Sequence, residues 1–78
     1  MVWANIRANT ETWLKKHPVI IDYLPDHQKI LIEDGVKISR CQILKRKEEH
    51  VLVEFGDKKN SWWLITDHWD GFKKFHIE

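Results

Sequence analysis

Short stretches in which apolar and polar residues alternate dominate this chain, and they predict strands rather than helices. The alternation is clearest over residues 28–33, where Ile30 and Ile32 share a face, and over residues 51–55. Residues 12–16 show the same pattern in shorter form. Because successive side chains of a strand point to opposite faces, each stretch would present one apolar face to a core. Short strands spaced about 8–12 residues apart predict a small all-β sandwich or barrel.

Turn residues divide these stretches and suggest how they connect. Residues 17–27 contain two prolines and predict a long, packed excursion between the first two strands. Asp34-Gly35 predicts a tight hairpin into residues 36–38, because such a turn needs a positive φ that Gly adopts easily. The apolar positions then change phase at Ser39 and Arg40, which predicts a bulge or sharp bend.

The C-terminal third is rich in tryptophan. Residues 62–65 are apolar on both faces, which predicts a central or doubly covered strand. Residues 67–71 predict a 3₁₀ turn, and residues 72–77 suit a closing strand or a tail that lies along the barrel. Residues 1–11 are ambiguous, and we interpret them as an N-terminal arm that docks Trp3 against the body or a neighbouring subunit. The predicted domain is then a five-stranded barrel over residues 12–78 preceded by this arm.

This order of elements resembles an SH3-like β-barrel. Individual residues along about residues 10–70 also resemble a short bacterial and phage module of the SH3b type, which often accompanies cell-wall or polysaccharide hydrolases. The matching positions are residues 12–16, residues 24–26 ahead of Lys29, Gly35, residues 50–51, Trp62 and residues 68–69. The resemblance implies an aromatic groove that binds peptides. The chain lacks the acidic loop and the Ala-Leu-Tyr-Asp-Tyr run of eukaryotic members, which argues against proline-rich ligands.

Composition narrows the function classes. The 78 residues carry 13 Lys and Arg against 12 Asp and Glu, so no net basic field favours nucleic acid. The single cysteine excludes an internal disulfide and a Cys-rich metal site. No apolar run approaches the ~18 residues of a membrane span, and no secretory signal is evident. We therefore expect a soluble cytoplasmic protein that is complete from Met1. Association with a virion or a multiprotein complex is compatible with this expectation.

Five tryptophans are many for so small a core. Each removes on the order of 150–250 Å² from water when buried, which corresponds to roughly 4–6 kcal/mol of transfer free energy. We therefore expect at least one to be partly exposed. Trp62 and Trp63 must face opposite ways in one strand, so one of them could join Trp69 and Tyr23 in an exposed aromatic strip. The predicted ligand or partner-binding residues are Trp62, Trp63, Trp69, Tyr23, His68 and Trp3. The alternative is that both faces of this strand are simply covered, the second by the N-terminal arm.

Other candidate chemistry is weaker. His68 and His76 lie near Asp67, Asp70 and Glu78, but a zinc site needs three or four converging ligands, so no metal or other cofactor is predicted. A His68 that ties down the 3₁₀ turn through a hydrogen bond is the favoured interpretation.

Cys41 is expected to be a buried apolar residue, since free cysteines are usually buried. Asp67 and Asp70 straddle Trp69, but a glycosidase needs two carboxylates in a cleft, and a convex barrel offers little cleft. The chain is therefore predicted not to be an enzyme.

Three functions remain open on the sequence. The first is a binding module that recognises a cell-wall peptide, a glycan or a protein partner through exposed Trp and Tyr. The second is a small structural or assembly protein that self-associates and buries its surplus tryptophans between subunits. The third, least favoured, is a barrel that binds single-stranded nucleic acid through basic clusters interleaved with aromatic residues.

Overall fold

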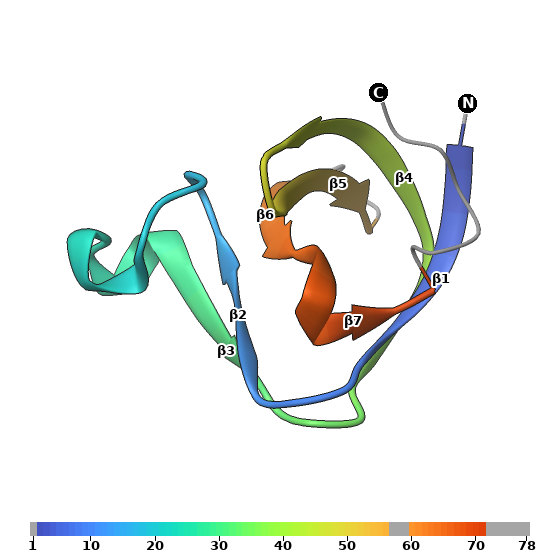
Figure 1. The fold of residues 1–78 in the computed structure, drawn as a ribbon, viewed down its shortest axis with the longest axis horizontal. Helices are drawn as coiled ribbons and strands as arrows, with labels where there is room; N and C mark the ends of the chain where they lie inside the picture. Colours follow the sequence, from blue (N-terminus) through green and yellow to red (C-terminus); the bar gives the residue numbers. More distant parts are fainter. Residues whose placement is uncertain (1, 57–59, 72–78) are drawn as a thin grey trace.

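The fold is all-β, as the alternation predicts. The computed structural model describes residues 2–56 and 60–71, and over these residues it consists of seven antiparallel strands and three 3₁₀ turns (Figure 1). The strands are β1 (Val2–Ala8), β2 (Thr12–Lys15), β3 (Lys29–Ile32), β4 (Lys37–Lys47), β5 (His50–Phe55), β6 (Asn60–Ile65) and β7 (Trp69–Asp70). The 3₁₀ turns are η1 (Ile21–Tyr23), η2 (Asp26–Gln28) and η3 (Thr66–His68).

The strands form one sheet in the order β3-β2-β6-β5-β4-β1-β7. The sheet curls strongly but does not close, so β3 and β7 are its two edges (Figure 1). The β2–β3 pair projects beside the curled body formed by the other strands. No helix among residues 2–56 and 60–71 has the length and apolar character that crossing a membrane requires.

The N-terminal segment is a strand of the sheet, and so are Trp69 and Asp70, which were predicted to lie in the 3₁₀ turn; together they raise the strand count from the predicted five to seven. β1 lies between β4 and β7 and pairs with both. Its inward residues Ala4, Ile6 and Ala8 are buried, whereas Trp3 and Asn5 are exposed. Alanine contributes little hydrophobic signal, so the alternation that defines this strand was not recognised in the sequence.

The turn at Asp34-Gly35 exists, with Gly35 at φ 90°, but it does not join a hairpin as predicted. β3 pairs with β2, and β4 pairs with β1 and β5. The turn is held instead by Ala8, whose N–H donates to Val36 O (2.9 Å) and whose carbonyl accepts from Gly35 N–H (2.8 Å). Residues 9–36 therefore form one excursion between β1 and β4, and β2 and β3 are its two arms.

The predicted bend at Ser39-Arg40 is confirmed. The β1–β4 register passes from Ala4 opposite Cys41 to Ile6 opposite Ile38, and Arg40 adopts φ 57°. Asn5 Oδ1 accepts a hydrogen bond from the Arg40 N–H (2.9 Å), which supports this conformation. The bend restores the inward phase, so Cys41 is fully buried, as expected for a small apolar residue.

The core lies inside the curled sheet. β6 is a central strand between β2 and β5, and its residues Trp62, Trp63 and Leu64 are all buried, which confirms that both of its faces are covered. The main cluster is formed by Ala4, Ile6, Ala8, Leu14, Cys41, Ile43, Val51, Val53, Trp62, Leu64 and Trp69. A 3₁₀ turn precedes the last described strand, as predicted, while the closing strand predicted at residues 72–77 lies outside the described residues.

Candidate functional site

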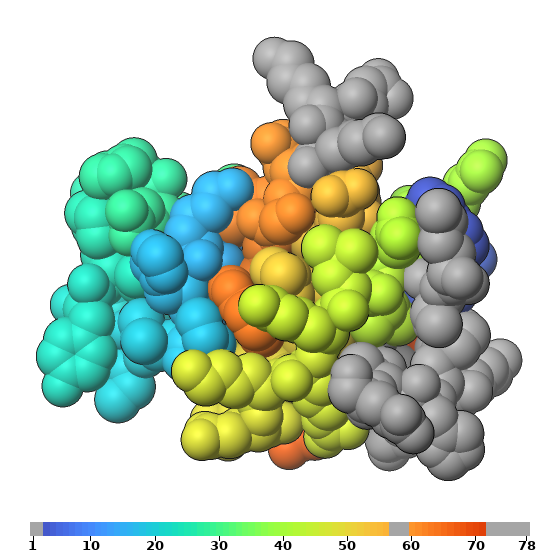
Figure 2. All heavy atoms as spheres, turned by 90° about the horizontal axis from the view of Figure 1, so that it is seen from above, coloured from blue at the N-terminus to red at the C-terminus, as the bar shows by residue number. Residues whose placement is uncertain are grey.

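A groove of about 450 Å³ lies between residues 18–21, which follow β2, and the turn that joins β4 to β5. In the space-filling view, the blue surface of the β2 region and the yellow surface of the β4–β5 turn lie on either side of atoms of β6 (Figure 2). Its lining combines apolar walls with a few polar groups: Trp13, Lys15, Pro18, Val19, Ile20, Ile21, Glu48, Glu49, His50, Ile65 and His68.

Residues 18–21, in the part of the excursion between β2 and β3, form the outer wall of the groove. Lys16 N–H donates to Gln28 O (3.0 Å), which extends the β2–β3 pairing just beyond the strands and fixes where the excursion leaves and returns. Within it, η1 closes through hydrogen bonds from Tyr23 N–H to Ile20 O (3.0 Å) and from Leu24 N–H to Ile21 O (2.9 Å). The buried Leu24 anchors this turn, which leaves Ile20 exposed along the groove.

The floor of the groove contains a buried lysine and a buried histidine. Lys15 Nζ lies 2.8 Å from His50 Nε2 and donates to Val19 O at 2.9 Å, and the two residues are only 2% and 7% exposed. They meet because β2 and β5 both flank β6, where Lys15 pairs with Trp63 and His50 pairs with Ile65. A lysine ammonium has only donors, so the neutral imidazole must accept through Nε2.

Burial sets the protonation of this pair. Desolvation lowers the pKa of Lys15, an effect partly offset by the negative charge of Glu49. Desolvation, followed by the positive charge of Lys15, lowers the pKa of His50, with Glu49 and Glu48 acting in the opposite direction. Both effects disfavour protonation of His50 and so favour the neutral imidazole, whose Nε2 can accept from Lys15.

Two glutamates at the β4–β5 turn form the opposite rim. Glu48 and Glu49 are exposed, and Glu48 adopts φ 55° at the tip of the turn. The Glu49 carbonyl accepts from Thr66 N–H (3.0 Å) and from Thr66 Oγ1 (3.2 Å), which fixes the rim to η3. This rim adds two carboxylates to a groove with apolar walls, which favours a positively charged group on a ligand.

His68 closes the end of the groove near η3. Its Nδ1 lies 2.7 Å from Thr12 Oγ1, so η3 is tied to β2 by the hydrogen bond expected from the sequence. Thr12 itself is buried. The hydrogen bond holds the excursion against the body at the opposite end from Lys15.

The predicted aromatic strip is not assembled. Trp62 and Trp63 are both buried, and Trp69, only 2% exposed, belongs to the core. Tyr23 (77% exposed) lies on η1, whereas Trp3 (47% exposed) lies on β1, which is separated from β6 by β5 and β4. The tryptophans fit inside because Lys16 lies over the Trp62 ring, with Nζ 3.7 Å from its centroid, and Lys45 Nζ lies 5.6 Å from the Trp63 centroid.

The groove residues Trp13, Lys15, Glu49 and His50 were not predicted as a site. Their signal in the sequence is slight: Lys15 is in phase with Trp13, and His50 opens a strand of otherwise apolar character. Their convergence depends on the pairing of β2 with β6, which joins residues far apart in the sequence.

The loose metal cluster is not formed over residues 2–56 and 60–71, where no three His, Cys, Asp or Glu side chains converge. His76 and Glu78 lie outside the described residues. Asp70 Oδ1 instead accepts a hydrogen bond from Asn9 Nδ2 (3.1 Å).

Comparisons with protein-family models, with curated proteins and with solved structures found no match to this chain.

Proposed function

We propose that this chain is a non-catalytic binding module of the SH3-like class, which holds an extended peptide segment of a partner in the groove between η1 and the β4–β5 turn. The observation that supports this best is the groove itself, with aliphatic and aromatic walls, a fixed floor and an acidic rim. Ligand sites are typically concave, mostly apolar and furnished with a few well-placed polar groups.

The order of the elements supports the SH3-like part of the proposal. β1 is followed by the long excursion of residues 9–36 and then by the bent strand β4. A short hairpin turn leads from β4 to β5, and β6, the 3₁₀ turn η3 and the short last strand β7 follow. This order shares a long excursion, a bent strand, a hairpin and a 3₁₀ turn with the order on which the resemblance rests. It differs in that the excursion starts after β1 rather than after residues 12–16, and in that no tight hairpin at Asp34-Gly35 joins β3 to β4.

The lining favours a peptide over a glycan. Sugar rings stack on exposed aromatic faces, but Tyr23 and Trp3 lie far apart and the groove holds one half-buried ring, that of Trp13. The apolar walls suit an aliphatic or aromatic side chain, and the carboxylates of Glu48 and Glu49 suit a neighbouring Lys or Arg. Because hydrogen bonds of Lys15 fix the wall and floor beforehand, little ordering would oppose binding.

Selection of a displayed library of random peptides on the immobilised protein tests this function. We expect enriched peptides to combine an apolar residue with Lys or Arg. Glu49→Lys should weaken their binding roughly tenfold, since it turns an attractive contact into a repulsive one. This substitution leaves the main-chain bonds of Glu49 to Thr66 in place.

Trp3→Ser is the matched control, because it removes an exposed aromatic side chain on a distant strand. It should leave the affinity unchanged. The proposal is wrong if no peptides are enriched, or if Trp3→Ser weakens binding while Glu49→Lys does not.

A further inference from the structure

β3 is an edge strand with large aliphatic side chains exposed on both of its faces. Among residues 2–56 and 60–71, it pairs only with β2 and ends the sheet (Figure 1). Ile30 and Leu31 point to opposite faces, as neighbours in a strand must, and they are 44% and 46% exposed. Proteins usually protect such edges with charges, prolines, bulges or a covering segment, because an open edge is a template for another strand.

The register identifies the backbone groups that face outward. Lys16 N–H donates to Gln28 O, so these two residues occupy a hydrogen-bonded position of the β2–β3 ladder. Hydrogen-bonded and non-hydrogen-bonded positions alternate in an antiparallel pair. Ile30 and Ile32 therefore direct their N–H and C=O groups toward β2, whereas Lys29 and Leu31 direct theirs away from the sheet.

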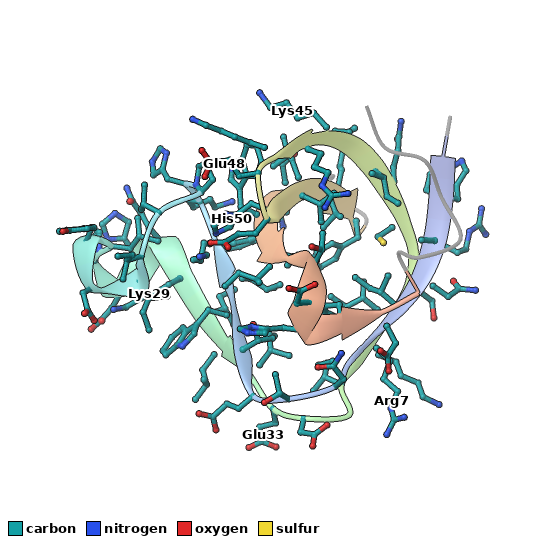
Figure 3. The ribbon with its side chains drawn as sticks, in the orientation of Figure 1. Arg7, Lys29, Glu33, Lys45, Glu48 and His50 are labelled. Atoms are coloured by element: carbon teal, nitrogen blue, oxygen red, sulfur yellow. The ribbon has the colours of Figure 1, made fainter. Side chains whose placement is uncertain are left out.

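We infer that this edge is the contact surface for a second copy of the chain, which pairs its own β3 antiparallel about a two-fold axis at Leu31. In this register Leu31 lies opposite Leu31 of the second copy, and Ile30 lies opposite Ile32. Lys29 then lies opposite Glu33. Figure 3 shows Lys29 and Glu33 near the two ends of β3, which this arrangement requires.

Charge complementarity selects this register and this occupant. A two-fold axis at Ile30 would instead place Lys29 opposite Leu31, and an axis at Ile32 would place Leu31 opposite Glu33. Only the axis at Leu31 joins each cation with an anion, twice over by symmetry, while covering apolar side chains on both faces. Opposite charges and aliphatic pairs across strands each stabilise pairing modestly.

The pairing surface is small, since β3 has four residues. Interfaces of this size belong to the weak class, so the dimer should form only at high protein concentration. The rim formed by Glu48 and Glu49 lies at the β4–β5 turn and not on β3, so pairing leaves it open. The inference is therefore independent of the proposed peptide binding.

Sedimentation velocity of the full chain from about 10 µM to about 1 mM tests the inference. We expect a concentration-dependent monomer–dimer equilibrium for the native protein. Glu33→Lys and Lys29→Glu should each weaken it roughly tenfold or more, because each places like charges opposite each other in both symmetry-related pairs. An equimolar mixture of the two variants should recover dimers, since the mixed dimer regains two attractive pairs.

The mixture keeps the test valid even if Lys29→Glu also disturbs the contacts of Lys29 within its own chain, namely its bond to Ile21 O (3.3 Å) and its position 5.5 Å from the Trp13 ring. Glu48→Lys is the control, because it makes the same charge change away from β3 and should leave the equilibrium unaltered. The inference is overturned if the native chain stays monomeric throughout. It is also overturned if the mixture dimerises no better than either variant, or if Glu48→Lys alone abolishes the dimer.

Discussion

The buried contact between Lys15 and His50 should contribute measurably to stability. His50→Leu fills a similar volume but removes the acceptor 2.8 Å from Lys15 Nζ, which leaves the ammonium with Val19 O. Hydrogen bonds to a charged group contribute about 1.5–3 kcal/mol. We therefore expect His50→Leu to lower the free energy of unfolding by about 2 kcal/mol. A domain of this size loses about 4–8 °C in Tm per kcal/mol, so the expected fall in Tm is about 8–16 °C.

The converse change should act through the histidine. Lys15→Met removes the charge and leaves the buried Nε2 of His50 without its donor, at a cost of about 1–3 kcal/mol. The double variant Lys15→Met/His50→Leu replaces both polar partners by apolar ones, which is often close to neutral. The two single losses sum to about 3–5 kcal/mol, so the loss of the double variant should be smaller than this sum by about 3–5 kcal/mol.

Urea denaturation followed by tryptophan fluorescence measures all four proteins of this double-mutant cycle. Lys47→Met, at the exposed end of β4, is the control for loss of a lysine charge and should change stability by less than about 0.5 kcal/mol. If the single losses add to within about 0.5 kcal/mol, the two side chains are not energetically coupled and the reasoning about the floor of the groove fails.

Four further outcomes follow from the structure. Because the pKa of His50 is lowered in the folded chain, the unfolded chain takes up a proton first as the pH falls below the ordinary value of about 6.5. The free energy of unfolding should thus decline with acidification in that range, and His50→Gln, measured by urea denaturation at several pH values, should reduce the decline. Gly71→Ala should destabilise the fold by about 1–3 kcal/mol, since Gly71 has φ 112° and an added Cβ would collide with Asn5 O; an unchanged Tm would contradict this. Glu48→Gly should raise stability by about 0.5–1 kcal/mol by relieving its positive φ, and a lower Tm would refute the argument. Cys41, fully buried and with its pKa raised by burial, should resist iodoacetamide in the native protein and react once urea unfolds it, as intact-mass measurement would show.

Local patterns in the sequence predict a substantial part of the fold. The change of phase at Ser39-Arg40 predicts the bend in β4, because an inward apolar face can be kept only by a bulge. The doubly apolar run at Trp62 and Trp63 predicts a strand covered on both faces. The hydrogen bond of His68 and the burial of Cys41 are likewise properties that short-range context suggests.

Pairing between distant segments could not be predicted in the same way. Asp34-Gly35 has the residues of a hairpin turn, yet the backbone of this turn is hydrogen-bonded to Ala8, and β3 pairs with β2. The reason is that turn chemistry specifies a local change of direction and not which strands lie on either side. Because β1 and β5 occupy the two sides of β4, β3 cannot pair with β4.

The candidate site shows the same division. By itself the sequence determined that the chain forms an all-β domain with a tryptophan-rich central strand, since alternation and bulk are properties of each segment. Only the tertiary structure decided that lysine side chains cover Trp62 and Trp63. It also decided that Lys15 and His50 meet beneath a groove bordered by two glutamates. Those contacts arise where strands distant in sequence share β6 as a neighbour, and the free energy that selects this pairing belongs to the whole sheet rather than to any one stretch of residues.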